Sequence, residues 1–170
     1  MKIPEKLRIL IITLSDRVAR GEYKDLSGPR IRDMLSVYLA SAGWNADITL
    51  TAIPDEADIL KELIISSCDN NNIIITTGGT GIGPRDITVD TVAPLLSKHI
   101  PGIMEFIRVR YGTEKPVALL SRAVAGIAGN SLIYTLPGSV RAVEEYMTEI
   151  LKSLEHTIYM QYGIDTHGKH

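Results

Sequence analysis

A glycine-rich segment, TTGGTGIGPRD at residues 76–86, is the part of this sequence best suited to chemistry. It follows an apolar run typical of a buried strand and precedes a segment expected to be helical from near Thr88. Glycines at positions 78, 79, 81 and 83 let the backbone approach a phosphate group without a side-chain clash, and a helix start favours an anion. The segment is not a Walker A loop, since no Gly-Lys-Ser/Thr follows, and it does not have the spacing of the dinucleotide-binding fingerprint. We interpret it as a phosphate cradle rather than as a flexible strand-to-helix connection.

Asp86, which closes this segment, allows two interpretations. An Asp close to the start of a helix is often an N-cap. Beside a phosphate cradle, however, a carboxylate would repel the ligand unless a divalent cation lay between them. Because Mg²⁺ takes one or two carboxylates together with phosphate oxygens, Asp86 is a candidate magnesium ligand.

The other polar candidates follow further apolar runs. Asp55 comes shortly after one such run, and its spacing alone indicates an N-cap. Asp16 and Arg17 end the first apolar run, where Arg17 could meet a phosphate or pair with a carboxylate. The pair Ser121–Arg122 follows a third run, and Arg122 could equally clamp an anion or form a surface ion pair.

Cysteine and histidine are not expected to carry the chemistry. The single cysteine, Cys68, excludes an intramolecular disulfide and is interpreted as a small core residue late in an amphipathic helix. No histidine is given a role, and His167 and His170 are interpreted as part of a polar chain end rather than as a metal site.

The elements that must position these residues alternate between strands and helices. The near-continuous apolar run at Leu7–Leu14 and the run at Ile73–Thr76 are typical of strands buried on both faces. Further strands are expected at Ala46–Ile53, Val117–Leu120 and Leu132–Leu136. Helices are expected over Ser27–Ala42, from Asp55, near Thr88, over Pro101–Tyr111 and after Ser139, with a tight turn over Ala125–Asn130. This order predicts an α/β fold, a three-layer sandwich with a mostly parallel sheet and helices on both faces.

In such sheets, ligands bind outside the carboxyl ends of the strands. The segments that follow the expected strands are Ser15–Arg17, Pro54–Asp55, the glycine-rich segment and Pro137–Gly138. We therefore expect the polar motifs to converge on one edge of the sheet.

Length and composition limit the class of protein. A chain of 170 residues with 45% hydrophobic and 22% charged residues is typical of one globular domain, which we expect over residues 1–170. The net charge of −2 excludes a generally basic surface that binds nucleic acid or an anionic membrane without sequence preference. No apolar stretch approaches the ~20 residues that span a bilayer, and the first apolar run ends without a signal-peptide cleavage site. A cytoplasmic protein that binds neither nucleic acid nor membrane is expected.

Four motifs together resemble the molybdopterin adenylyltransferases. They are LSDR at residues 14–17, IPDE at 53–56, TTGGTGIGPRD at 76–86, and LSRAVAGIAG…LPGS between residues 120 and 139. This family comprises the MogA-type bacterial enzymes and the G domains of plant and animal molybdenum-cofactor proteins. The resemblance covers nearly the whole chain, with the motifs in the family's order, and the SRAVAG segment also resembles MoaB-type relatives.

The resemblance implies a three-layer α/β domain that binds Mg²⁺ with ATP and molybdopterin. The family transfers AMP to the terminal phosphate of molybdopterin and releases pyrophosphate. Its members are usually homotrimers, and MoaB-type relatives can be hexamers. The product is the substrate for molybdate insertion, so the downstream molybdate-insertion protein is a further expected partner.

Carried onto this sequence, the resemblance also implies roles for individual residues. Gly78, Gly79, Thr80, Gly81 and Asp16 would bind the nucleotide. Asp86 and Asp55 match the family's functional aspartates, which replaces the N-cap interpretation of Asp55, and Asp86 would hold Mg²⁺. The residues matching the molybdopterin side of the pocket are Ser15, Ser121, Arg122, Pro137, Gly138 and Ser139.

Other functions are compatible with the same residues. A carrier of the MoaB type would hold molybdopterin and pass it on without catalysis. An assembly scaffold is disfavoured because the chain ends soon after its last expected helix. An unrelated nucleotide-dependent enzyme is the remaining alternative.

Overall fold

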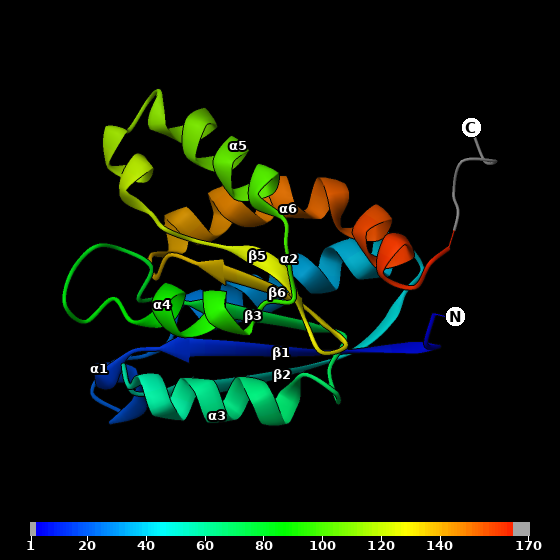
Figure 1. Cartoon of the computed structure of the whole chain (residues 1–170), viewed down its shortest axis with the longest axis horizontal. Coiled ribbons are helices and arrows are strands. Elements are labelled where there is room, and N and C mark those ends of the chain that lie inside the picture. Colours follow the sequence, from blue (N-terminus) through cyan, green and yellow to red (C-terminus); the bar gives the residue numbers. More distant parts are fainter. Residues whose placement is uncertain (1–2, 165–170) are drawn as a thin grey trace.

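A six-stranded sheet runs through the computed structural model, which describes residues 3–164 (Figure 1). The strands are β1 (Lys6–Leu14), β2 (Asn45–Ile53), β3 (Ile73–Thr77), β4 (Lys98–His99), β5 (Ala125–Ala128) and β6 (Ser131–Leu136). They lie in the order β2-β1-β3-β6-β5-β4. The neighbouring strands β2, β1, β3 and β6 are parallel, whereas β5 runs antiparallel to β6 and β4 runs antiparallel to β5. The predicted mostly parallel sheet is confirmed.

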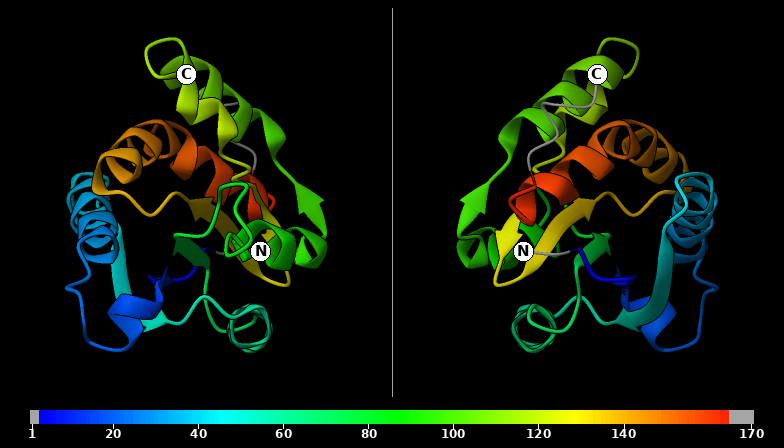
Figure 2. Two further views of the ribbon diagram at one scale, coloured as in Figure 1. Left: turned by 90° about the vertical axis from the view of Figure 1, so that its left-hand side faces the viewer. Right: turned by 90° about the vertical axis from the view of Figure 1, so that its right-hand side faces the viewer.

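The central strands are buried on both faces because their side chains alternate between two hydrophobic cores. In β1, Ile9 and Ile11 belong to one core and Leu10 and Ile12 to the other. The first core is covered by α2 (Ser27–Ser41), α5 (Pro101–Gly112) and α6 (Val140–Gln161), and the second by α3 (Ala57–Ser67) and α4 (Thr88–Val92). Figure 2 shows these helices on opposite sides of the sheet, so the three-layer prediction also holds.

Three short helices complete the described chain. They are α1 (Asp16–Ala19) and the 3-10 helices η1 (Ala93–Leu95) and η2 (Pro116–Leu120). None of the helices within residues 3–164 is long and apolar enough to span a lipid bilayer. The sequence positions His167 and His170 lie outside the described residues.

The strand predicted over Val117–Leu120 is wrong, because this segment forms η2 instead. Pro116 starts η2, and the segment packs on α5, where Leu119 lies against Gly112. The side chains of Val117, Leu119 and Leu120 are more than half exposed, so the apolar run is not a core strand. Its residues instead border a cavity, as described below.

The tight turn predicted over Ala125–Asn130 is also wrong in extent. Residues Ala125–Ala128 form β5, which pairs with β6 as a hairpin, and the chain reverses at Gly129 and Asn130. Strand β4, which pairs with β5, was not predicted. Gly126 is required here, because a Cβ atom on it would collide with the backbone oxygen of Lys98.

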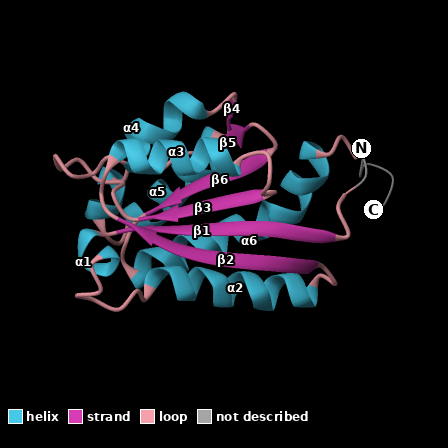
Figure 3. Ribbon diagram, turned by 90° about the horizontal axis from the view of Figure 1, so that it is seen from below, coloured by secondary structure: helices cyan, strands magenta, loops and turns pink. Residues whose placement is uncertain are grey.

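The carboxyl ends of the four parallel strands meet at one edge, as Figure 3 shows by the common direction of their arrowheads. The Ser15 N–H donates to the Ile53 carbonyl (3.0 Å), and the Gly78 N–H donates to the Leu136 carbonyl (2.9 Å). These bonds join the segments that follow β1 to β2 and β3 to β6. The expected convergence of the polar motifs on one edge is therefore confirmed.

Candidate active site

Three adjacent cavities open at this edge of the sheet. The main cavity, of about 460 Å³, lies between the glycine-rich segment, η2 and the start of α6. The aspartate cavity, of about 400 Å³, is lined by Leu14, Ser15, Asp16, Arg17, Arg20, Asp55, Gly79, Arg85 and Asp86. The side cavity, of about 310 Å³, lies between the end of β1 and the start of α2. Gly79 and Asp86 border both the main and the aspartate cavity, so two ligands bound there would approach each other at these residues.

The start of the glycine-rich segment forms a defined turn that requires glycine and is held by Thr88. Gly78 and Gly79 have φ angles of +107° and +63°, which L side chains rarely adopt. A Cβ atom at Gly78 would collide with the Leu14 carbonyl. Thr88 holds this turn, since its hydroxyl donates to the Gly78 carbonyl (2.7 Å) and its N–H to the Gly79 carbonyl (3.0 Å). These two glycines are thus required by the fold itself, whatever ligand binds.

The later glycines make room for the carboxylate of Asp86. A Cβ atom at Gly81 would lie 2.7 Å from Asp86 Oδ2, and one at Gly83 would lie 3.0 Å from it. Asp86 Oδ2 accepts a hydrogen bond from the Gly83 N–H (2.8 Å), so the carboxylate folds back into its own loop. The N-cap residue of α4 is Ile87. Asp86 therefore does not cap α4 and instead borders two cavities.

Arg122 ties down the same loop from outside the cavities. Its Nε donates to the Gly81 carbonyl (2.7 Å) and its Nη2 to the Asp86 carbonyl (2.9 Å), while its backbone N–H donates to the Thr80 carbonyl (2.9 Å). The guanidinium also pairs with Asp90 (2.7 Å), whose hydrogen bond from Arg122 lowers the pKa of this carboxyl group. Of the two interpretations left open by the sequence, the structure shows the ion pair. Arg122 lines none of the three cavities, so its expected contact with molybdopterin finds no support in this geometry.

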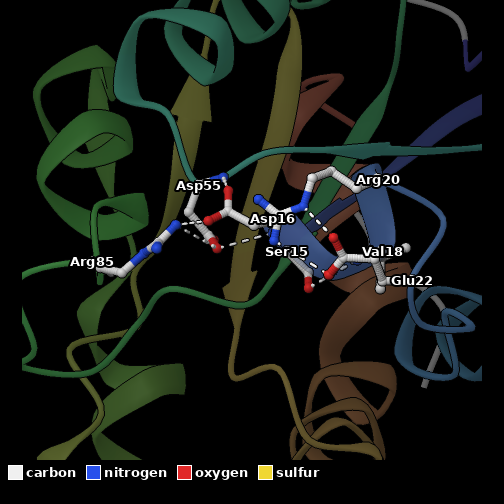
Figure 4. Close-up of polar contacts among 7 residues, drawn as sticks. All are labelled: Ser15, Asp16, Val18, Arg20, Glu22, Asp55 and Arg85. Atoms are coloured by element: carbon white, nitrogen blue, oxygen red, sulfur yellow. Dashed lines mark hydrogen bonds and ion pairs between the residues drawn. The ribbon is translucent and has the colours of Figure 1, made fainter.

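The side-chain carboxylates of Asp16 and Asp55 each accept a hydrogen bond from the backbone N–H of the other residue (Figure 4). The Asp16 N–H donates to Asp55 Oδ2 (3.2 Å), and the Asp55 N–H donates to Asp16 Oδ1 (3.0 Å). Asp55 does not cap α3, whose N-cap residue is Glu56. Burial raises the pKa of the Asp55 carboxyl group, and the negative charge of Asp86 raises it further.

Arg85 supplies the positive charge at this pair of aspartates. Its guanidinium forms an ion pair with Asp16 and lies 3.9 Å from Asp55 Oδ2. The sequence analysis did not single out Arg85, although a cation directly before Asp86 in a proposed phosphate cradle was an available signal. In Figure 4 it reaches across from the glycine-rich segment to residues that follow two other strands.

The expected molybdopterin residues divide between the cavities. Ser121, Pro137, Gly138 and Ser139 line the main cavity, whereas Ser15 lines the aspartate and side cavities. Two of the serines also have local roles, since Ser15 caps α1 by accepting from the Val18 N–H and Ser139 caps α6 by accepting from the Ala142 N–H. Of the expected nucleotide residues, Gly79, Thr80 and Gly81 line the main cavity, and Gly79 and Asp16 line the aspartate cavity. Gly78 lines none of the three cavities.

The main cavity also has lining residues that the sequence analysis missed. Tyr146 donates its hydroxyl to Ser121 Oγ (2.9 Å), and burial raises the pKa of this phenol. Lys115 and Arg141 both pair with Glu145 at 3.1 Å. These residues carry no recognisable motif, because η2 and α6 bring them together only in the fold. Together with Ile82, Val117, Ala118 and Leu120, they give the cavity an apolar wall with two cations.

The described residues contain no cluster of three or more His, Cys, Asp or Glu side chains arranged to hold a metal ion. Asp16, Asp55 and Asp86 nevertheless line one cavity. Since Mg²⁺ needs only one or two carboxylates when phosphate oxygens supply further ligands, these side chains fit a magnesium ion that also binds phosphate.

The fold and the site define an α/β domain with adjacent cavities at the carboxyl ends of its parallel strands, where ligands bind in open α/β sheets. A family model described as "Probable molybdopterin binding domain" matches residues 10–156, and the chain belongs to this family. This confirms the recognition made from the sequence motifs.

Individual relatives match this chain over nearly their full lengths. The molybdopterin adenylyltransferase of Helicobacter pylori is 32% identical over 161 residues, covering 94% of this chain and 90% of that protein. The molybdenum cofactor biosynthesis protein B of Staphylococcus carnosus is 36% identical over 162 residues, covering 94% and 93%. Among solved structures, the molybdopterin biosynthesis enzyme MoaB of Thermus thermophilus superposes with a TM-score of 0.81 at 34% identity, covering 92% and 97%.

Proposed function

We propose that this protein is a molybdopterin adenylyltransferase of molybdenum cofactor biosynthesis, which transfers AMP from ATP to the terminal phosphate of molybdopterin. Relatives that carry this name support the proposal. The observation that carries it is the shared border of the main and aspartate cavities at Gly79 and Asp86. Two phosphorylated substrates, one in each cavity, would meet there with their phosphates facing each other.

The reaction requires no nucleophile from the protein. An oxygen of the terminal phosphate of molybdopterin attacks the α-phosphorus of ATP, the bond to the β-phosphate breaks, and pyrophosphate leaves. Catalysis then consists of positioning and charge neutralisation. We assign the nucleotide phosphates to the backbone of residues 78–81 and propose that Asp16 contacts the nucleotide from the aspartate cavity through the accompanying cation.

Asp86 is proposed to hold Mg²⁺, with Asp55 orienting the metal or the substrate. When bound, Mg²⁺ would neutralise the phosphates that otherwise face three carboxylates. The Asp86 carboxylate accepts a hydrogen bond from the Gly83 N–H, and this bond would hold it at the border of the two cavities.

The main cavity is proposed to bind molybdopterin. Its apolar wall suits a planar pterin, and Lys115 and Arg141 suit a phosphate. Ser121, Pro137, Gly138 and Ser139 line this cavity, and Ser15 would contact the ligand from the adjoining cavities. Arg122 would act on binding through the loop that it holds.

The test is release of pyrophosphate from ATP, Mg²⁺ and molybdopterin. We expect turnover by the native chain and a loss of at least about 100-fold in Asp86→Asn, which keeps an acceptor for the Gly83 N–H but loses the charge. Asp33→Asn is the matched control, because Asp33 is exposed on α2 and pairs with Arg32. Normal turnover by Asp86→Asn would remove Asp86 from the mechanism.

A carrier that binds molybdopterin without catalysis is the second candidate, and the similarity to the biosynthesis protein B of Staphylococcus carnosus, whose name states no reaction, is compatible with it. The same assay separates the two functions. Binding of molybdopterin by the native chain without release of pyrophosphate supports the carrier and contradicts the transferase.

We propose that the chain acts as a single domain over residues 1–170 and assembles as a homotrimer, with a hexamer as the alternative. Apolar side chains exposed on α5 support self-association, namely Phe106 and Val109. Delivery of the product to a molybdate-insertion protein and a cytoplasmic location stay predictions.

A further inference from the structure

Arg85 joins the glycine-rich segment to the ends of two strands by ion pairs, and the arginine differs from its aspartate partners in exposure. The side chain of Arg85 is 69% exposed, whereas those of Asp16 and Asp55 are each 19% exposed. The two aspartates are also held by reciprocal hydrogen bonds to each other's backbone. The carboxylates are therefore held in place on both strand ends, whereas the long, exposed arginine side chain has room to turn away from them.

A comparison of Arg85 with Arg122 supports this distinction. Arg122 donates to two carbonyl groups of the glycine-rich segment and to Asp90, so the loop backbone depends on it. The ion pairs of Arg85 join side chains only, with Asp16 and Asp55. Arg85 can leave its partners while the Arg122 bonds still hold the loop.

The present position of Arg85 is poorly suited to a bound nucleotide. Arg17 and Arg20 also line the aspartate cavity, but phosphates that enter it still meet the carboxylates of Asp16, Asp55 and Asp86. Any cation that accompanies the phosphates to these carboxylates meets the Arg85 guanidinium. Arg85 directly precedes Asp86, which borders both cavities. A turn of its side chain toward the entering phosphates would resolve both conflicts, because guanidinium groups bind phosphate well.

We propose that Arg85 is a switchable counter-ion. In the ligand-free protein it neutralises Asp16 and Asp55, and when a nucleotide binds it turns to the phosphates and leaves the two carboxylates to the accompanying divalent cation. The choice of a nucleotide as ligand rests on the proposed function. The competition between Arg85 and a divalent cation rests only on the observed ion pairs.

The first experiment titrates the full chain with Mn²⁺ alone and measures binding by electron paramagnetic resonance. We expect Arg85→Ala to bind Mn²⁺ about fivefold more tightly than the native chain, the size expected for loss of an exposed ion pair. Arg85→Lys should stay close to the native affinity. Arg20→Ala is the matched control, because Arg20 lines the same cavity but pairs with Glu22. An unchanged affinity in Arg85→Ala, or an equal gain in Arg20→Ala, would overturn the proposal.

The second experiment measures binding of ATP with Mg²⁺ by calorimetry. Here Arg85→Ala should bind about tenfold more weakly, because a charged hydrogen-bond donor to the phosphates is lost. A purely structural role would weaken both kinds of binding, so the opposite signs identify the switch, and weaker Mn²⁺ binding in Arg85→Ala contradicts it. Neither measurement needs turnover. A native chain that shows both effects but releases no pyrophosphate would contradict the transferase and leave the switch supported.

Discussion

At the scale of single residues, Asp55 carries its charge in an unfavourable place. Burial and the charge of Asp86 both raise the pKa of its carboxyl group. A carboxyl group whose pKa is higher in the folded than in the unfolded chain favours folding while protonated and loses that contribution as the pH rises through the folded-state value. Ionisation of Asp55 therefore disfavours the folded chain, and a carboxyl group with a perturbed pKa in a cavity is typical of a functional residue.

We accordingly predict that Asp55→Asn is at least as stable as the native chain at pH 7 but at least about 100-fold less active. The amide oxygen can still accept from the Asp16 N–H, so the local backbone is kept. Any advantage in stability should shrink as the pH falls toward the ordinary aspartate value of about 4. Thermal unfolding at several pH values, with turnover at pH 7, checks both parts. A marked loss of stability at pH 7 would mean that the carboxylate of Asp55 is structural.

At the scale of the elements, the glycine-rich segment is built into the sheet at Gly78. This residue has a φ of +107°, and a side chain on it would collide with the carbonyl of Leu14 at the end of β1. The strand-to-helix connection thus depends on Gly78 independently of any ligand.

We predict that Gly78→Ala lowers the free energy of unfolding by about 2–4 kcal/mol, since it combines backbone strain with a steric clash. Gly102→Ala is the matched control, because Gly102 lies in the first turn of α5 and nothing stands within 4 Å of an added Cβ atom. That variant should be unchanged or slightly more stable, as alanine favours a helix. Denaturant unfolding of both variants and of the native chain measures these differences in the free energy of unfolding. Equal stability of Gly78→Ala and the native chain would contradict the argued role of Gly78.

At the scale of the whole molecule, the centre of the parallel sheet was predictable because β1 and β3 are buried on both faces. The isoleucine-rich runs of β1 and β3 read directly as such strands. The antiparallel edge was not predictable, since three of the four residues of β5 are Ala or Gly and its conformation is set by pairing with β6. The apolar run of η2 misled for the opposite reason, because its side chains border a cavity instead of entering a core.

The site shows the same division. Residues in motifs at strand ends, such as Asp16, Asp55 and Asp86, could be placed at one edge from the topology rule alone. The ion-pair partners at the site could not be predicted, because Arg85 reaches Asp16 and Arg122 reaches Asp90 only once the glycine-rich loop has folded. Lys115, likewise, joins the main cavity only because η2 follows α5 at that edge.

The proposed homotrimer gives the last prediction. Phe106 and Val109 lie three positions apart on α5 with 53% and 63% of their surfaces exposed, and Figure 2 shows α5 on the outer side of α6. If this face holds the subunits together, the double substitution Phe106→Glu with Val109→Glu should give single folded chains of 18.6 kDa, because it places charges at an apolar contact. Light scattering during gel filtration measures the mass, and circular dichroism checks the fold. Val37→Glu, at another exposed apolar position on α2, should leave the trimer intact. A trimer that survives the double substitution would place the subunit contact on another face of the domain.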